Sequence, residues 1–237
     1  MNRLPVVFIF FFIIGNAHAQ GAKQDTIFLS SSIKNTRALY TKWLSVQSLL
    51  YNGKSPKKYE DDILDLVPFY LPDWEDGTVY YDGELYEAVP LMYDLVSDKV
   101  IVSQARSYSE IELISSKVER FTIRDNFFVH LRTPGLEDGF YQLLYDGGTK
   151  LFVRRKKIIE DNIAAGKVVH EVSAVDRYFI YKEGNYTPVK KLSSVLNVLA
   201  DKAKELKSYS KKNRLDFRNK KESSLMLLVR HYDQAIQ

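Results

Sequence analysis

Three hairpin patterns constrain the fold of this chain more than any other feature. Each places a Gly-containing turn between short runs rich in Tyr, Phe, Val and Leu, as in two antiparallel strands joined by a tight turn. They span Val79–Tyr86, Phe140–Val153 and Tyr178–Val189. Further strands are expected at Val100–Gln104, Glu110–Ile114, Val118–Ile123 and Phe127–Leu131.

The short spacing of these strands leaves no room for crossover helices, so the sheet should be antiparallel. About eight to ten strands would lie within residues 63–190, enough to curve into a half-barrel or a partly open β-barrel.

Helical patterns flank the strand-rich region. Residues 33–51 place Leu39, Trp43, Val46 and Leu50 on one stripe, and Asn52-Gly53 suits a helix end. A polar loop should follow at Lys54–Asp62.

Residues 193–236 predict a C-terminal helical hairpin. Ser193 or Ser194 would cap its first helix, which should fray near Asn213. Asn219 and Glu222 resemble a capping box for the last helix. The buried stripe of that helix would comprise Leu225, Leu228 or Val229, Tyr232 and Ile236. We therefore predict a single α+β domain over residues 33–237: a curved antiparallel sheet or partly open barrel with an N-terminal helix and a C-terminal helical hairpin.

Residues 1–19 have the pattern of a cleaved secretory signal. Arg3 precedes an apolar run over residues 4–14, and Ala17-His18-Ala19 is a small-x-small cleavage site. The run is shorter than the roughly 20 residues of a membrane span. We expect export to the periplasm or exterior after cleavage at Ala19, a flexible leader over residues 20–32, and no transmembrane segment in the mature chain.

The chain contains no cysteine, which excludes disulfides, thiolate nucleophiles and Cys-ligated metals. Its charge is asymmetric: residues 59–98 hold twelve acidic and no basic residues, whereas residues 190–221 hold eleven basic residues. Such an asymmetry can steer a charged partner, or the two regions can face each other within one domain, which is the interpretation we favour. The lysines on the last helices, Lys204, Lys207 and Lys211 among them, are expected to form a solvated face. An exported chain does not meet chromosomal DNA, so no nucleic-acid partner is expected.

Catalytic and metal-binding signals are weak. The mature histidines His130, His170 and His231 show no metal-ligand spacing, and no Gly-x-Ser-x-Gly elbow, Walker loop or His-Glu-x-x-His motif occurs. Residues 73–77 bring three carboxylates together but lack the ligand alternation of a calcium loop. We predict no catalytic residues, no metal and no cofactor.

Aromatic residues supply the candidate binding surface. Tyr80, Tyr81 and Tyr86 crowd one hairpin, so strand alternation must turn one of each adjacent pair outward. Together with Trp74 they are the predicted contact residues for a partner, which would be an envelope protein, a lipid or a glycan.

Several segments resemble one family of uncharacterised exported β-rich proteins of Gram-negative bacteria. They are residues 77–96, 139–147, 151–157, 178–190 and 213–232, and the similarity runs from about Leu49 to the C-terminus. The string Asp-Gly-x-Leu-Tyr followed by Pro-Leu-x-Tyr-Asp is its most specific part. The resemblance implies export and a shared fold, and it brings no activity or catalytic residue.

Three functional hypotheses follow. The first is a non-enzymatic exported binding or interaction protein of the cell envelope. The second is a carrier of a lipid or other apolar ligand, by analogy with small barrels. The third is an envelope hydrolase that uses His130 or His170 with a nearby carboxylate. The absence of a catalytic motif favours the first hypothesis and leaves catalysis open.

Overall fold

The computed structural model describes residues 33, 36, 49–104, 109–164 and 167–236. The chain divides into two units, Met1–Ser45 and Val46–Gln237, and the description below concerns the second. The predicted signal (1–19) and leader (20–32) lie outside the described residues. Most of the predicted helix 33–51 does too, although Ile33 and Thr36 are helical. The last three residues of that range form a 3₁₀ helix, η1 (Leu49–Tyr51).

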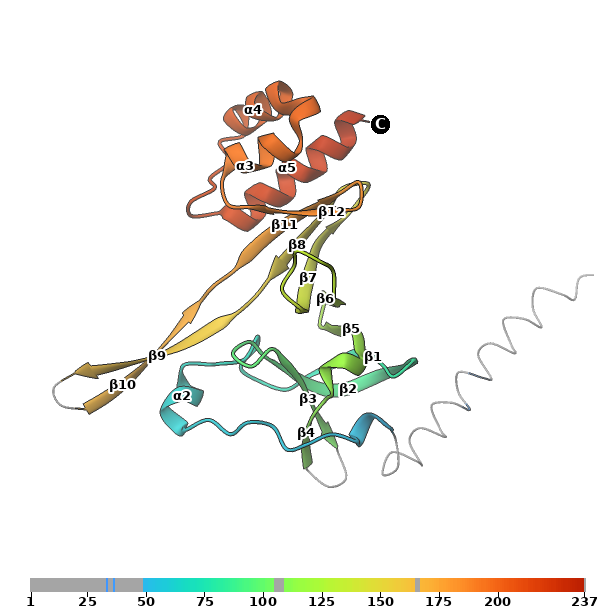
Figure 1. Cartoon of the computed structure of the whole chain (residues 1–237), viewed down its shortest axis with the longest axis vertical. Coiled ribbons are helices and arrows are strands. Elements are labelled where there is room, and N and C mark those ends of the chain that lie inside the picture. The colour runs from blue at the N-terminus through green and yellow to red at the C-terminus, as the bar shows by residue number, and fades with distance from the viewer. Residues whose placement is uncertain (1–32, 34–35, 37–48, 105–108, 165–166, 237) are drawn as a thin grey trace, which may run out of the picture. The chain divides into compact units, whose positions relative to one another are not determined.

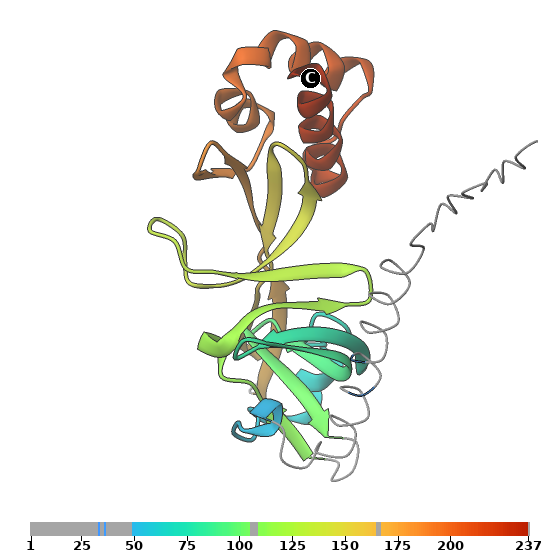
Figure 2. The same ribbon diagram turned by 90° about the vertical axis from the view of Figure 1, so that its right-hand side faces the viewer.

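The second unit is built on an open antiparallel sheet of ten strands, shown in Figure 1. The strands lie in the order β12-β11-β8-β7-β6-β5-β1-β2-β3-β4. Their bounds are β1 Glu75–Tyr81, β2 Glu84–Asp94, β3 Lys99–Gln104, β4 Ser109–Glu112, β5 Val118–Ile123, β6 Asn126–Leu131, β7 Gly139–Asp146, β8 Lys150–Arg154, β11 Arg177–Lys182 and β12 Asn185–Val189. The sheet curves without closing, which confirms the predicted fold class (Figure 2).

Two of the three predicted hairpins close through turns that need positive φ angles. Asp82 and Gly83 have φ of 53° and 85°, and Glu183 and Gly184 have φ of 51° and 82°. Two consecutive residues in this region form the turn whose twist matches that of the flanking strands. Glycine at the second position adopts this conformation without a steric penalty.

The sequence patterns did not predict one pair of strands. Strands β9 (Lys157–Ala164) and β10 (Lys167–Ala174) form a separate two-stranded sheet, hereafter the ribbon. Its register continues that of β8 and β11: Arg154 lies opposite Arg177, Lys157 opposite Ala174, and Ala164 opposite Lys167. A single long hairpin therefore contributes two strands to the main sheet and then extends from it as the ribbon (Figure 1).

The sheet carries separate apolar clusters. The first lies over β1–β3 and β5–β7, and its rings include Tyr93, Phe121, Phe128 and Phe140. The second joins β8, β11 and β12 to the C-terminal helices. Because Leu151 and Val153 belong to the second cluster and Phe152 to a third, the two faces of β8 are both covered. The two edge strands of the sheet are β4, which has only four residues, and β12, which contains the exposed Pro188.

The helical parts are α2 (Asp61–Asp65), η2 (Ser115–Lys117), α3 (Leu192–Val198), η3 (Ala200–Lys202), α4 (Ala203–Lys212) and α5 (Lys221–Ile236). The predicted C-terminal hairpin is present, with its first arm divided by η3. Helix α2 replaces the end of the predicted polar loop. Among the described helices, none combines the length and apolar character required to span a membrane.

The predicted helix caps need correction. Ser194 is the third residue of α3, and its Oγ accepts bonds from the backbone N–H groups of Lys190 (2.9 Å) and Lys191 (3.2 Å). In the turn before α5, Asp216 Oδ1 accepts the backbone N–H groups of Arg218 and Asn219, and the Asn219 side chain donates to Asp216 Oδ2. Glu222 forms an ion pair with Arg155 in place of the expected contact with Asn219. Of the predicted buried stripe, Ile236 is exposed because it is the last residue of the helix.

A buried arginine lies where the long hairpin leaves the sheet. Arg154 is 3% exposed, and its Nη2 donates to Asp98 Oδ2 (2.9 Å), to Glu137 Oε1 (3.3 Å) and to the carbonyl of Asp138 (3.1 Å). Its guanidinium also lies over the ring of Tyr141. Removal of one member of a buried ion pair leaves the other charge uncompensated.

We predict that Arg154→Ala lowers the free energy of unfolding by about 3–5 kcal/mol, because it leaves Asp98 desolvated without its partner. Urea unfolding followed by circular dichroism measures the change. The matched control is Lys156→Ala, since Lys156 also pairs with Glu137 but is more exposed; it should cost less than about 1 kcal/mol. Equal losses in the two variants would contradict the role given to burial.

Glu137 should contribute to acid sensitivity. The ammonium of Lys156, with Arg154 and Arg177, holds the pKa of Glu137 below its ordinary value of 4.5. The pKa of Glu137 is lower in the folded state than in the unfolded state. The ionised carboxylate therefore stabilises the fold at a pH above the unfolded-state pKa, and this stabilisation is lost as the pH falls through the folded-state pKa. Glu137→Gln should therefore flatten the stability–pH curve on the acid side. Identical curves for variant and parent would refute this.

Candidate functional site

The ribbon has two distinct faces, because residues directly opposite each other in an antiparallel ladder project to the same side. One face carries the pairs Ile159–Val172, Asp161–His170 and Ile163–Val168. The other face carries the pairs Ile158–Ser173, Glu160–Glu171 and Asn162–Val169.

The ribbon exposes large apolar side chains on both faces. Ile163 is 84% exposed and Val168 60% exposed on the first face, while Ile158 and Val169 are 44% and 47% exposed on the second. Neither strand pairs with a third strand among the described residues. Side chains of this kind gain stability only when another surface covers them.

Two carboxylates oppose each other on the second face. Glu160 and Glu171 are direct cross-strand partners, and the amide of Asn162 donates to Glu171 Oε2 (3.4 Å). Like charges in this position destabilise a ladder by about 0.2–1 kcal/mol. The pair therefore does not serve the stability of the ribbon itself.

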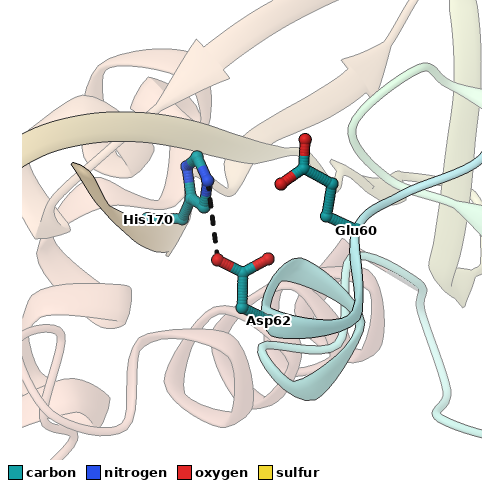
Figure 3. A group of neighbouring side chains, drawn as sticks. All are labelled: Glu60, Asp62 and His170. Atoms are coloured by element: carbon teal, nitrogen blue, oxygen red, sulfur yellow. Dashed lines mark ion pairs between the residues drawn. The ribbon is translucent and has the colours of Figure 1, made fainter. Parts of the chain in front are cut away.

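His170 connects the first face of the ribbon to α2. Its Nδ1 lies 2.8 Å from Asp161 Oδ1 on the neighbouring strand, and its Nε2 lies 3.5 Å from Asp62 Oδ2 on α2. Glu60, immediately before α2, turns toward the same point, as Figure 3 shows. One ligand atom from each of Glu60, Asp62 and His170 lies within 4.8 Å of the others.

The electrostatics of this cluster favour a positive charge. The hydrogen bond to Asp161 raises the pKa of His170 above its ordinary value of 6.5 and outweighs desolvation, which lowers it, while the charges of Asp62, Asp161 and Glu60 add to the rise. The imidazole is thus surrounded by three carboxylates that stabilise a cation.

Lys157 fixes the base of the ribbon. Its Nζ donates to the carbonyls of Val67 and Phe69 (2.9 Å to the latter), and its backbone N–H donates to the carbonyl of Leu95 (3.0 Å). Burial lowers the pKa of this amine. The ribbon is therefore held at two levels, by Lys157 to the segment after α2 and by His170 to α2 itself.

The predicted aromatic surface is partly in the core. Tyr81 and Tyr86 are buried, and so are not available as exposed contact residues. Tyr80 and Trp74 are half-buried, and the guanidinium of Arg120 covers the ring of Tyr80 at 4.1 Å. Adjacent residues of a strand point to opposite faces, so Tyr80 and Tyr81 were expected to differ in burial in this way. A binding role for Tyr80 and Trp74 stays a prediction.

The other candidate residues lie apart from one another. His130 lies in β6, and its Nε2 is 2.6 Å from Asp138 Oδ1 in the loop before β7. His231 stacks on Tyr209 in the C-terminal helices. His130 and His170 each have the carboxylate neighbour that the hydrolase hypothesis needs, and hydrolysis stays a prediction. In residues 73–77, Glu75 belongs to β1 and pairs with Arg124.

The acidic region forms ion pairs with the middle of the chain, whereas we expected it to face residues 190–221. Glu75, Asp82 and Asp98 of the acidic region form ion pairs with Arg124, Lys117 and Arg154 in the middle of the chain. The lysines Lys204, Lys207 and Lys211 are exposed, as expected for a solvated face.

The carboxylates Glu60 and Asp62 were not found by sequence reasoning. They lie about 110 residues before His170, and no motif spacing connects segments so far apart. The only available signal was the run Glu60-Asp61-Asp62 itself, which is common in solvated loops. His170 could have been placed near residues 60–62 only if strands β9 and β10 had been predicted.

Comparisons with protein-family models, with curated proteins and with solved structures found no match to this chain. The resemblance to exported Gram-negative proteins therefore stays a prediction. The ribbon and its histidine are interpreted from their own geometry.

We predict that His170→Ala loosens the ribbon. Loss of the contacts with Asp161 and Asp62 should make local opening of the ribbon easier, by the small amount typical of ion pairs at a surface. Hydrogen exchange measured in EDTA should then become up to about fivefold faster in β9 and β10. Exchange in β7 and β8 should not change, and His231→Ala should leave the ribbon unaffected. Unchanged ribbon exchange in His170→Ala would contradict the contact.

Proposed function

We propose that the chain is an exported interaction protein of the cell envelope and that the ribbon is its contact surface. The observation that carries this proposal is the exposure of Ile158, Ile163, Val168 and Val169 on a hairpin that is otherwise fully paired. Apolar side chains that gather on a surface and are rimmed by polar groups are typical of protein interaction sites. Export is supported by the signal pattern of residues 1–19.

The chemistry of the partner follows from the second face of the ribbon. Ile158 and Val169 flank the opposed carboxylates Glu160 and Glu171 on that face. A partner protein that places a Lys or Arg side chain between these carboxylates would relieve their repulsion, while its apolar residues cover the two aliphatic side chains. The expected partner is therefore a protein with an apolar patch that contains a basic residue.

Site-specific photo-crosslinking in the native host tests this function. A photoreactive phenylalanine analogue at Val169 should give one discrete adduct on the exported chain, because this position faces the partner. The matched control is Leu85, a large residue 53% exposed beside the turn of a different hairpin. It should give no adduct of the same mass.

A charge reversal provides the second arm. Glu160→Lys combined with Glu171→Lys keeps the repulsion between the strands and inverts the charge that the partner meets. The Val169 adduct should fall at least tenfold in this variant. An adduct of equal yield at Leu85, or one unaffected by the reversal, would overturn the proposed surface.

A further inference from the structure

The cluster that joins the ribbon to α2 has the composition of a metal site. We propose that Glu60, Asp62 and His170 together bind a transition metal ion, with Zn²⁺ as the best fit. This inference goes beyond the proposed interaction function and does not depend on it.

The separation of the ligand atoms supports the proposal. His170 Nε2 and Asp62 Oδ2 lie 3.5 Å apart and face each other in Figure 3. Zinc bonds of about 2.1 Å in a tetrahedral site place neighbouring ligand atoms roughly 3.4 Å apart. The two groups are thus separated as two ligands of one ion would be. The cluster distance of 4.8 Å brings Glu60 within reach through a small change of its exposed side chain.

The type of ligand selects the metal. One imidazole nitrogen and two carboxylates suit Zn²⁺ and related first-row ions, whereas Ca²⁺ and Mg²⁺ prefer all-oxygen sites. Three protein ligands also leave a fourth position for solvent or for a group of a partner. The structure therefore points to a zinc-type site with an accessible coordination position.

Asp161 holds the histidine in the required orientation. Its Oδ1 lies 2.8 Å from Nδ1 of His170, so that nitrogen donates its hydrogen to the carboxylate and Nε2 is directed toward Asp62 and Glu60. A carboxylate on the second nitrogen is a usual companion of metal-bound histidine and increases its basicity. Asp161 is thus a positioning residue and contributes no ligand.

The position of the site in the chain gives the ion a mechanical role. Glu60 and Asp62 flank the start of α2, and His170 lies near the middle of β10. A bound ion would join two segments that are about 110 residues apart in the sequence. It would hold the ribbon against α2 more firmly than the ion pair of His170 with Asp62 does alone.

Isothermal titration with Zn²⁺ alone tests the site on the purified chain after EDTA treatment and dialysis. We expect one ion per chain, with Mg²⁺ and Ca²⁺ giving no heat. His170→Ala and Asp62→Asn should each weaken binding at least about 100-fold, and Asp161→Asn roughly tenfold. Circular dichroism establishes that each variant is folded.

Two measurements separate this site from adventitious binding. The matched control is His231→Ala, because His231 also has a carboxylate neighbour, Glu205, but lies away from the cluster; its affinity should equal that of the parent. Co²⁺ in place of Zn²⁺ should give the intense visible absorption of a tetrahedral site, lost in His170→Ala. Absence of Zn²⁺ binding, or equal binding by His170→Ala, would overturn the proposal.

Discussion

The register of one hairpin determines the positions of both the core and the candidate site. From Lys150 opposite Tyr181 to Ala164 opposite Lys167, every pair of this hairpin follows the same alignment. Side chains alternate between faces with a period of two, so a slip of one residue would move every side chain to the opposite face. Leu151 would leave the apolar cluster in the same step that took His170 away from α2. Burial of β8 and β11 in the core thus fixes the register that positions the exposed side chains of the site on the ribbon.

Two arginines mark the point where this hairpin leaves the sheet. Arg154 is buried against Asp98 and Glu137, as described above. Arg155, the next residue, donates to Gln142 Oε1 (2.7 Å), Asp176 Oδ2 (2.6 Å) and Glu222 Oε2 (2.8 Å). The last contact joins the strand to α5. Because adjacent strand residues point to opposite faces, the junction is fixed from both sides. The ribbon therefore starts from a rigid base.

The sequence predicted the sheet well because its signals are local. Turns such as Asp82-Gly83 and Glu183-Gly184 dictate a backbone conformation by themselves, and every expected strand is present in the structure. The ribbon was missed because β9 reads Lys-Ile-Ile-Glu-Asp-Asn-Ile-Ala, which lacks a polar–apolar alternation. Its fold is imposed by continuation of the neighbouring register. The site was missed for the same reason, since Glu60, Asp62 and His170 meet only through that ribbon. The expected capping box at α5 was wrong because the Asn219 side chain donates to Asp216 and Glu222 pairs with the distant Arg155, a contact that local sequence does not reveal.

The edges of the two sheets carry different risks of aggregation. In the main sheet, β12 contains Pro188, which has no N–H to offer, and β4 is only four residues long and carries exposed polar side chains. Both devices discourage the addition of a strand from another molecule. The ribbon has neither a proline nor short strands: both strands have eight residues, and each has an outer edge without a ladder partner in the described part of the chain. If copies of this chain form fibrils when crowded, the ribbon is the segment from which cross-β growth would start.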